Sequence, residues 1–210
     1  MFLQKRMYGR EPKDFRYTPL MYKDLLAPLR DRSTPTAQFR KAADKIANVL
    51  FDDLKNKLEG VDENNVITVC ILRSAIVFLP AAFESFPSSP VAVVGIKRDE
   101  ETAEPHSYYE NIPPITSDSI IIIPDPMLAT GGTATDIVSR LLKAGASASN
   151  IHFLSIISAP EGVEKLAELI PKENITVAAV DDGMDARKFI VPGLGDFRDR
   201  YFGFGPEVGT

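Results

Sequence analysis

Short apolar runs alternate along the chain with stretches in which apolar residues recur at helical spacing. The runs are rich in Val and Ile and predict buried strands over 66–72, 91–97, 120–123, 151–157 and 175–180. Strands separated by helices predict an α/β fold, a mainly parallel sheet with helices on both faces. In such a fold we expect the site beyond the carboxyl ends of the strands.

The predicted helices begin and end at recognisable residues. Thr34 and Pro35 predict the start of an amphipathic helix over 35–57, with Thr34 as its cap and Pro35 in its first turn. Further helical patterns cover 75–86, the residues from Thr133 to a stop at Gly145, and a stretch that begins at 158–162 and ends at Pro171.

The stretch from residue 120 to 133 carries the clearest chemical signal. A buried strand runs into Asp125, and the following loop holds Thr130 and the adjacent Gly131 and Gly132 before a helix begins. Adjacent glycines let backbone N–H groups converge on one anion, and the helix directs its positive end to the same point. Asp125 can face ribose hydroxyls or a magnesium ion. This order of features predicts a sugar-phosphate site.

Two other kinds of phosphate-binding loop do not match this stretch. No Lys follows the glycines, which excludes a Walker loop, and the spacing is not that of G-x-G-x-x-G. The structural alternative is a plain strand-to-helix turn capped by Thr133.

Two arginines also follow predicted strands. Arg73 comes directly after the 66–72 strand, where a positive charge is well placed for an anion. Taken alone it would be interpreted as a surface residue, and the other motifs reverse that interpretation. Arg98 follows the 91–97 strand and opens a polar stretch, 98–114. We expect this stretch to be a solvated loop or a lid over the site.

Composition excludes several function classes. With 24 basic and 29 acidic side chains among 210 residues, the formal charge is −5, which argues against general nucleic-acid binding. No apolar run reaches the roughly 18 residues of a membrane-spanning helix, and residues 1–20 lack the apolar region of a secretory signal. The single Cys70 excludes an internal disulfide and fits a reducing compartment, so we expect a cytoplasmic protein.

Residues 125–133, Asp-Pro-Met-Leu-Ala-Thr-Gly-Gly-Thr, resemble the phosphoribosyl pyrophosphate (PRPP) loop of uracil phosphoribosyltransferases. Most type I phosphoribosyltransferases carry two acids in this loop, whereas the uracil branch has Asp-Pro, as here. The resemblance covers about residues 20–205, with further motifs in the same order at Arg73, at Arg98 and at 190–200. It implies the type I phosphoribosyltransferase fold with a small base-binding hood.

The resemblance also implies roles for individual residues. Asp125, Arg73 and Asp196 become the catalytic candidates. PRPP binding is implied for Asp196, for both arginines and for the loop itself, which comprises Asp125, Pro126, Met127, Leu128, Ala129, Thr130, Gly131, Gly132 and Thr133. Arg73 would begin the segment that receives pyrophosphate, although this chain has Ser74-Ala75 where the family usually has Ala-Gly.

Residues 189–203 are rich in glycine and charge, and by themselves predict a shaped loop rather than a core element, with an ordinary surface connection as the alternative. They resemble the family's loop that holds uracil. The resemblance implies a base-binding loop over 187–205, in which backbone groups beside Ile190, Gly195, Asp196 and Phe197 recognise the base.

This loop departs from the family pattern. Phe189 replaces the usual Tyr, Phe197 resembles the eukaryotic branch, and Arg198 replaces a glycine. Because glycine can mark a backbone angle that strains other residues, Arg198 either adopts an allowed conformation with its side chain in solvent or reshapes the base site. We expect the first, since Asp196, Asp199 and Arg200 are retained.

The resemblance implies that the protein transfers phosphoribose from PRPP to uracil, giving UMP and pyrophosphate. It further implies magnesium carried by PRPP, GTP as an activator as in some relatives, and a homo-oligomer, either a dimer or a tetramer. We expect residues 1–20 to form an arm and residues 21–210 a single domain. A phosphoribosyltransferase for another base and a catalytically inactive nucleotide-sensing homologue stay open as alternatives.

Overall fold

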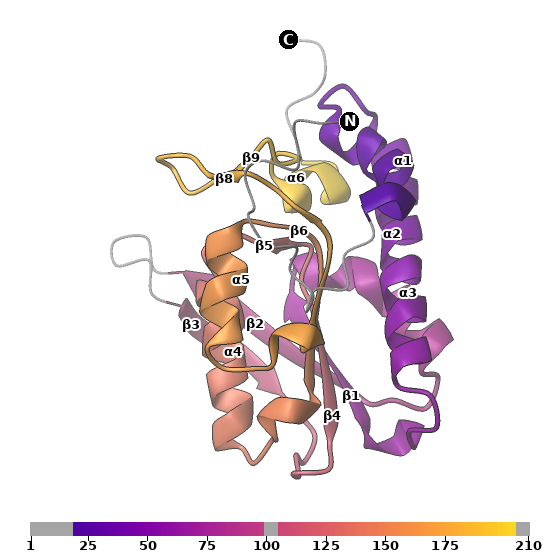
Figure 1. Cartoon of the computed structure of the whole chain (residues 1–210), viewed down its shortest axis with the longest axis vertical. Helices are drawn as coiled ribbons and strands as arrows, with labels where there is room; N and C mark the ends of the chain where they lie inside the picture. The colour runs from indigo at the N-terminus through magenta and orange to yellow at the C-terminus, as the bar shows by residue number, and fades with distance from the viewer. Residues whose placement is uncertain (1–18, 99–104, 205–210) are drawn as a thin grey trace.

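The computed structural model describes residues 19–98 and 105–204 (Figure 1). A mainly parallel sheet lies at its centre, with strand order β3-β2-β1-β4-β6, and both β5 and β7 also pair with β6. Only β2 and β3 run antiparallel among these pairs. The strands are β1 Val66–Leu72, β2 Val91–Arg98, β3 Pro105–Asn111, β4 Ile120–Pro124, β5 Met127–Leu128, β6 Ile151–Ser158 and β7 Ile175–Val180.

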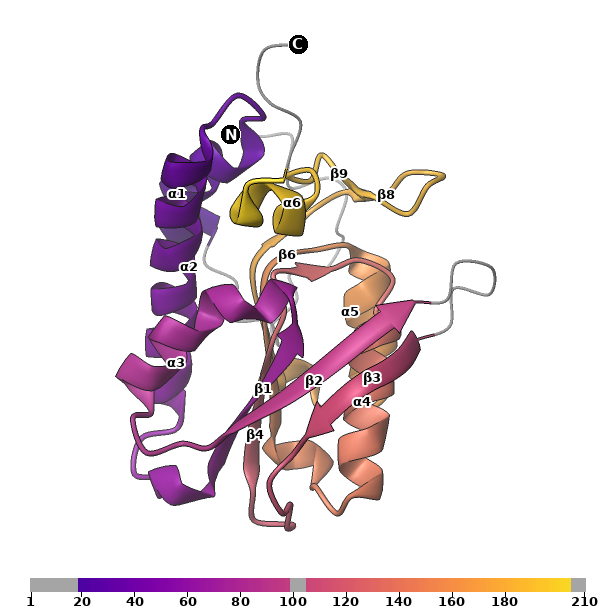
Figure 2. The same cartoon turned by 180° about the vertical axis from the view of Figure 1, so that it is seen from behind.

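Helices cover both faces of the sheet, as predicted (Figures 1 and 2). Strand β4 shows why, because its apolar side chains alternate: Ile122 packs with the helices of one face, and Ile121 and Ile123 with those of the other. The first face carries α1 Pro19–Arg30, α2 Thr36–Lys57 and α3 Leu79–Ser85, and the second carries α4 Gly132–Lys143 and α5 Pro160–Ala167.

A small unit lies beyond the carboxyl ends of the strands, next to α1 (Figures 1 and 2). It contains the antiparallel pair β8 Gly183–Met184 and β9 Ile190–Val191, followed by α6 Phe197–Phe202. We call residues 183–203 the hood. The prediction that 189–203 is not a core element was wrong, because Leu194 and Phe197 are buried in the core under α2. The rings of Phe197 and Phe39 lie 5.3 Å apart.

Two further predictions were wrong in detail. Helix α2 begins at Thr36, so Pro35 occupies the cap position and no side chain caps the helix; Thr34 therefore does not have the expected role. Residues 105–111, expected in a loop, form the edge strand β3. Its Tyr108 ring lies against Gly95 of β2, where an added Cβ would lie only 2.5 Å from the ring.

The tip of the 98–114 stretch, residues 99–104, and the expected arm, apart from its last two residues, lie outside the described residues. Helix α1 was not predicted, because Pro28 lies within it and interrupts the helical pattern. None of the helices in the described part of the chain is long and apolar enough to cross a membrane.

Candidate active site

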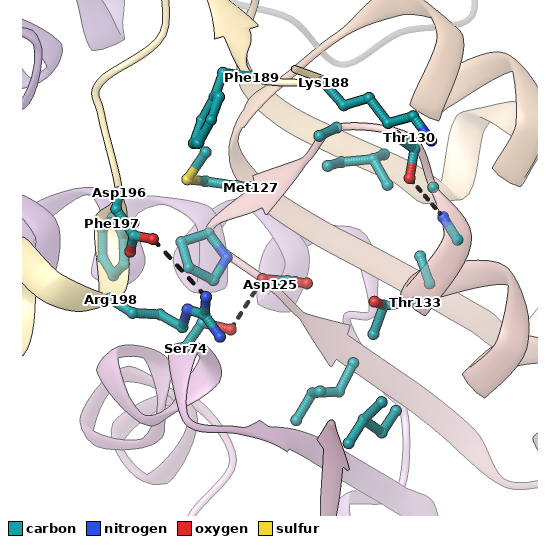
Figure 3. Close-up of a pocket in the computed structure, with 18 of the residues that line it drawn as sticks. Ser74, Asp125, Met127, Thr130, Thr133, Lys188, Phe189, Asp196, Phe197 and Arg198 are labelled. Carbon is teal, nitrogen blue, oxygen red and sulfur yellow. Dashed lines mark hydrogen bonds and ion pairs between the residues drawn. The ribbon is translucent and has the colours of Figure 1, made fainter. Parts of the chain in front are cut away.

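A pocket of about 510 Å³ opens where the sheet meets the hood (Figure 3). Its floor comes from the carboxyl ends of β1 and β4, through Leu72 and Asp125, and one wall is the loop up to Thr133. Its roof comes from the hood, through Phe189 and Asp196. The pocket therefore lies beyond the strand ends, where a parallel sheet is expected to bind its ligand.

The loop before α4 has the geometry of an anion site. Gly131 adopts a left-handed conformation, with φ of 72°, and α4 begins at the next residue without a side-chain cap. Thr133 lies inside the helix and lines the pocket, so the alternative of a plain turn capped by Thr133 was wrong. The Gly132 N–H lies 3.3 Å from Thr130 Oγ1, and both residues line the pocket.

Gly162, on a different helix, lets this loop pack closely against α5. Gly162, at the start of α5, lies so close to the loop that an added Cβ would be 2.3 Å from the carbonyl oxygen of Ala129. A Cβ on Gly131 would in turn lie 3.0 Å from the carbonyl oxygen of Gly162. The anion loop and α5 are thus in backbone contact, which the sequence pattern did not reveal because Gly162 belongs to a separate element.

Asp125 lies on the pocket floor, directly after β4. Its backbone N–H donates to the carbonyl of Leu154, at 2.9 Å, which continues the ladder to β6. Its Oδ1 accepts a hydrogen bond from the hydroxyl of Ser74 at 3.3 Å (Figure 3). Ser74, from the turn after β1, also lines the pocket. Sequence reasoning treated Ser74 only as a departure from a motif, and the structure brings it to the predicted carboxylate.

Arg73, one of the two arginines assigned to PRPP, is not among the described residues that line this pocket. Arg73 is exposed, and its guanidinium carbon lies 5.7 Å from the ring centre of Phe202 in α6. Its neighbours Leu72 and Ser74 do line the pocket, so Arg73 lies at the rim. Arg98 is the last residue of β2, and its side chain lies outside the described part of the structure.

The predicted base loop reaches the pocket in part. Gly195, Asp196 and Phe197 line it, whereas Ile190 is buried in the core below. The Phe197 ring stacks on Tyr201, with ring centres 5.6 Å apart. This packing fixes the backbone at the start of α6, since the Phe197 side chain has no room to turn.

Arg198 has the allowed backbone that we expected, because it lies within α6. Its side chain is not simply in solvent: it lines the pocket, and its guanidinium lies 3.8 Å from Oδ2 of Asp196. Asp196 also caps α6, accepting from the backbone N–H of Asp199 at 3.1 Å.

Lys188 is a charged pocket residue that sequence reasoning missed. It precedes Phe189 in the hood and lines the pocket, with φ of 65°. Its ammonium group extends toward the Thr130 side of the pocket (Figure 3). No pattern pointed to Lys188, because a basic pair such as Arg187-Lys188 usually indicates a solvated turn.

Two sets of hydrogen bonds connect the hood to the first helices. Arg30, at the end of α1, donates to both carboxylate oxygens of Asp181, and Asp181 accepts from the N–H of Gly193. Arg200 of α6 donates to three backbone carbonyls, those of Leu29, Asp31 and Leu194.

Arg200 stays charged in this setting. Burial lowers the pKa of its guanidinium, and the nearby Arg32 lowers it further, while Asp31 opposes the shift. An arginine pKa begins so far above neutrality that these effects leave the proton in place. The guanidinium carbon lies 4.2 Å from the ring centre of Phe39, which adds a cation–π contact.

A family model described as uracil phosphoribosyltransferase matches residues 52–204. The chain belongs to this family. The uracil phosphoribosyltransferase of Oceanobacillus iheyensis is 37% identical over 195 residues, which cover 85% of this chain and 92% of the relative. That of Campylobacter fetus is 36% identical over 192 residues, covering 84% and 91%.

Solved structures have a similar fold. The AQ2163 protein from Aquifex aeolicus is similar with a TM-score of 0.77 and 30% identity, covering 88% of this chain and 95% of that one. A purine phosphoribosyltransferase from Pyrococcus horikoshii has a TM-score of 0.51 and 16% identity, covering 68% and 84%, and supports the fold alone. The expected type I phosphoribosyltransferase fold is confirmed.

Proposed function

We propose that this protein transfers the phosphoribosyl group of PRPP to uracil, forming UMP and pyrophosphate. One observation carries the proposal: in a member of the uracil phosphoribosyltransferase family, a single pocket joins the anion loop at 130–133 to the hood loop at 195–197. A sugar phosphate and a base can therefore occupy one pocket and react there.

The pocket has a place for each part of PRPP. The 5′-phosphate binds at 130–133, where backbone N–H groups and the positive end of α4 meet. Asp125 faces the ribose hydroxyls from the floor. The diphosphate then lies beyond Asp125, on the Ser74 side, with Arg73 at the rim. Arg98 is the last residue of β2, which runs parallel to β1, so its backbone lies at the same end of the sheet as Arg73. We assign Arg98 to PRPP binding as well.

Uracil binds under the hood. The base offers one N–H between two carbonyls, and fixed backbone groups beside Ile190, Gly195, Asp196 and Phe197 can match that edge without loss of side-chain entropy. The hydrogen bonds that Arg200 donates support this assignment. One of them holds the carbonyl of Leu194, which directly precedes the backbone groups at 195–197. A base that mismatched them would leave buried polar groups unsatisfied.

The reaction is a displacement at the anomeric carbon of ribose through an oxocarbenium-like state, and it requires no covalent nucleophile. The chain contributes by holding the base and the sugar in line and by excluding water beneath the hood. Asp125 positions the ribose and places negative charge near the cationic sugar, while the arginines stabilise charge on the departing pyrophosphate.

Magnesium fits this pocket as a partner of PRPP rather than as an ion held by the protein alone. Among the described residues, no group of three or more acidic, His or Cys side chains could hold a metal. Magnesium commonly binds through one or two carboxylates, waters and substrate phosphates, and Asp125 is the carboxylate on the pocket floor. The ion would supply positive charge to the diphosphate leaving group.

Purified protein with magnesium, PRPP and radiolabelled uracil tests the proposal, and UMP is the expected product. Parallel reactions with adenine, guanine, hypoxanthine and cytosine test the alternative of another base. A thermal-shift series with PRPP, UMP, GMP and GTP tests the inactive, nucleotide-sensing alternative. Stabilisation by PRPP and UMP agrees with the enzyme, whereas turnover of another base but not uracil would make the assignment wrong.

GTP activation, a dimer or tetramer, a cytoplasmic location and the role of residues 1–20 stay predictions. Each has a direct measurement: initial rates with added GTP, light scattering on the purified protein, cell fractionation, and deletion of residues 1–20.

A further inference from the structure

Two of the described residues that line the pocket are positively charged, Lys188 and Arg198, and both belong to the hood. They lie on opposite sides of the pocket: Lys188 extends toward Thr130, and Arg198 toward Ser74 and Asp125 (Figure 3). We infer that these two cations divide the anionic groups of the substrate, with Lys188 binding the 5′-phosphate and Arg198 the diphosphate. The inference rests on the proposed function.

Lys188 supplies a charge that the anion loop lacks. Residues 125–133 include no basic side chain, so their phosphate site depends on N–H groups and on the helix end. Lys188 faces that site from the hood, across the pocket. An ammonium group placed there neutralises a phosphate as the lysine of a Walker loop does, although it comes from a distant segment.

The backbone around Lys188 is built to present it. Oδ1 of Asp185 accepts from the N–H groups of Arg187 and Phe189, each at 2.9 Å. The Lys188 N–H donates to the carbonyl of Asp185, also at 2.9 Å. These three bonds hold a tight turn in which Lys188 has a positive φ, a conformation that costs a non-glycine residue about 1 kcal/mol or more. Asp185 thereby fixes the backbone from which the Lys188 side chain extends toward the pocket.

Arg198 has the complementary position. Helix α6 and the cap by Asp196 fix its backbone. Its guanidinium lies 3.8 Å from Oδ2 of Asp196, which is an ion pair but too long for a hydrogen bond. The side chain is 53% exposed. Its N–H groups therefore line the pocket without a short hydrogen bond to Asp196. A guanidinium can donate two N–H hydrogen bonds to a diphosphate at once.

The shape of the substrate decides which cation meets which group. In PRPP the phosphate is attached at C5 of ribose and the diphosphate at C1, on opposite sides of the ring oxygen. With the 5′-phosphate at 130–133 and the ribose at Asp125, the diphosphate must extend toward Ser74. That is the side to which Arg198 points. Because Lys188 and Arg198 both belong to the hood, PRPP would contact the hood through its 5′-phosphate and through its diphosphate.

Binding of the two halves of the substrate, measured separately by calorimetry, tests the division. Lys188→Ala should weaken ribose 5-phosphate by about fivefold and leave pyrophosphate within about twofold of the wild type. Arg198→Ala should do the reverse, and each should weaken PRPP by about fivefold; a charge-assisted bond in a half-exposed site is expected to contribute on this scale. Arg187→Ala is the matched control, because Arg187 adjoins Lys188 but does not line the pocket, and it should change neither ligand.

Each other pattern overturns the inference. Equal losses of affinity for both ligands in both variants would mean that the two cations act only through their overall positive charge. If Lys188→Ala weakened pyrophosphate and Arg198→Ala weakened ribose 5-phosphate, the substrate would lie in the opposite orientation. No loss of affinity would mean that both side chains are in solvent and do not touch the ligands. The proposed function is scored separately, by UMP formation in the wild type. An enzyme that forms UMP while the variants show no selectivity would refute the division alone. A wild type that forms UMP but binds neither ligand would also refute the division alone, whereas a wild type that forms no UMP would refute the proposed function.

Discussion

Asp125 belongs both to the sheet, through its backbone, and to the pocket, through its side chain. Its N–H still belongs to the ladder with β6, while its carboxylate is already on the pocket floor. The side chain of such a residue moves little, because its backbone is fixed by the sheet. A carboxylate placed there can hold the ribose in one orientation, which is the main contribution expected of a positioned group in a displacement reaction.

Asp125→Asn should reduce kcat/KM for UMP formation by at least about tenfold, or about 1.4 kcal/mol of transition-state stabilisation. The amide keeps the shape of the side chain but removes the negative charge next to the cationic sugar. Asp118→Asn, in an exposed turn, is the control and should leave the kinetics unchanged. A folded Asp125→Asn protein with wild-type kinetics would remove this residue from the site.

Arg73 gives a second test at this scale. Its position at the rim, beside Leu72 and Ser74 of the pocket, supports a contact with the diphosphate. Arg73→Ala should therefore raise the KM for PRPP by about tenfold while changing the KM for uracil by less than about twofold. Steady-state kinetics with each substrate varied in turn provide the measurement. Equal changes for both substrates would mean that the diphosphate has been misplaced.

At the scale of elements, the contact between α5 and the loop at 129–131 sets the shape of the proposed phosphate site. The carbonyl of Ala129 passes over Gly162 with no space for a side chain. Two opposing effects would follow from an added methyl group there. Alanine favours a helix over glycine by about 1 kcal/mol, whereas overpacking against backbone costs about 1–3 kcal/mol. Backbone cannot rotate away, so the second effect should be the larger.

Gly162→Ala should therefore lower the free energy of unfolding by about 1–2 kcal/mol, a fall in Tm of about 2–8 °C for a domain of this size. The displaced loop should also raise the KM for PRPP more than that for uracil. Glu164→Ala, on the exposed side of the same helix, is the control for helix propensity. A Gly162→Ala protein that is more stable than the wild type would show that the loop has room to move.

The clamp by Arg200 connects α6 to the turn between α1 and α2. Arg200→Lys keeps the charge but loses the planar fork that reaches three carbonyls and the face of Phe39. We expect a loss of about 2 kcal/mol in stability, seen as a fall in Tm of about 4–8 °C. The KM for uracil should rise more than that for PRPP, because the carbonyl of Leu194 is released. Arg187→Lys, on the hood surface, should change neither quantity.

At the scale of the whole molecule, one buried group connects stability to pH. His152 of β6 is 5% exposed, and its Nδ1 has no hydrogen-bond partner among the described residues. Burial lowers the pKa of its imidazole to about 4, and the positive charge of Lys57 contributes to the shift. The folded protein therefore keeps His152 neutral at a pH at which the unfolded chain, with a pKa of about 6.5, already binds the proton.

Stability should fall as the pH decreases from about 6.5 toward 4, since the unfolded state binds more protons in that range. Between pH 7.5 and 5, His152 should account for a loss of about 2 kcal/mol. Urea unfolding of the wild type and of His152→Leu at both pH values measures this, and the variant should lose less by about that amount. Equal pH dependence in the two proteins would show that His152 is solvated.

The sequence predicted the features that depend on local patterns. The core strands and the helix pattern followed from periodicity, and the loop that enters α4 and lines the pocket followed from glycines and hydroxyls between a strand and a helix. It did not predict β3 or the burial of Phe197, because each depends on a partner far along the chain, and it missed α1 because Pro28 interrupts the helical pattern. Tyr108, for instance, lies in a polar stretch, and only Gly95 across β2 makes room for it. Lys188 belongs to the same class, since its role comes from the position of the hood.

The contact between Phe39 and Phe197 has a consequence for how the protein is made. The two rings are separated by 158 residues, and the ribosome completes the loop at 130–133 well before it supplies the hood that covers the pocket. Closing so long a segment also makes this contact a late step in folding. Limited proteolysis of ribosome-stalled chains should detect protection by PRPP only once residue 202 has left the exit tunnel. Until then, we expect a nascent chain to have the loop at 130–133 in place and yet not to retain PRPP.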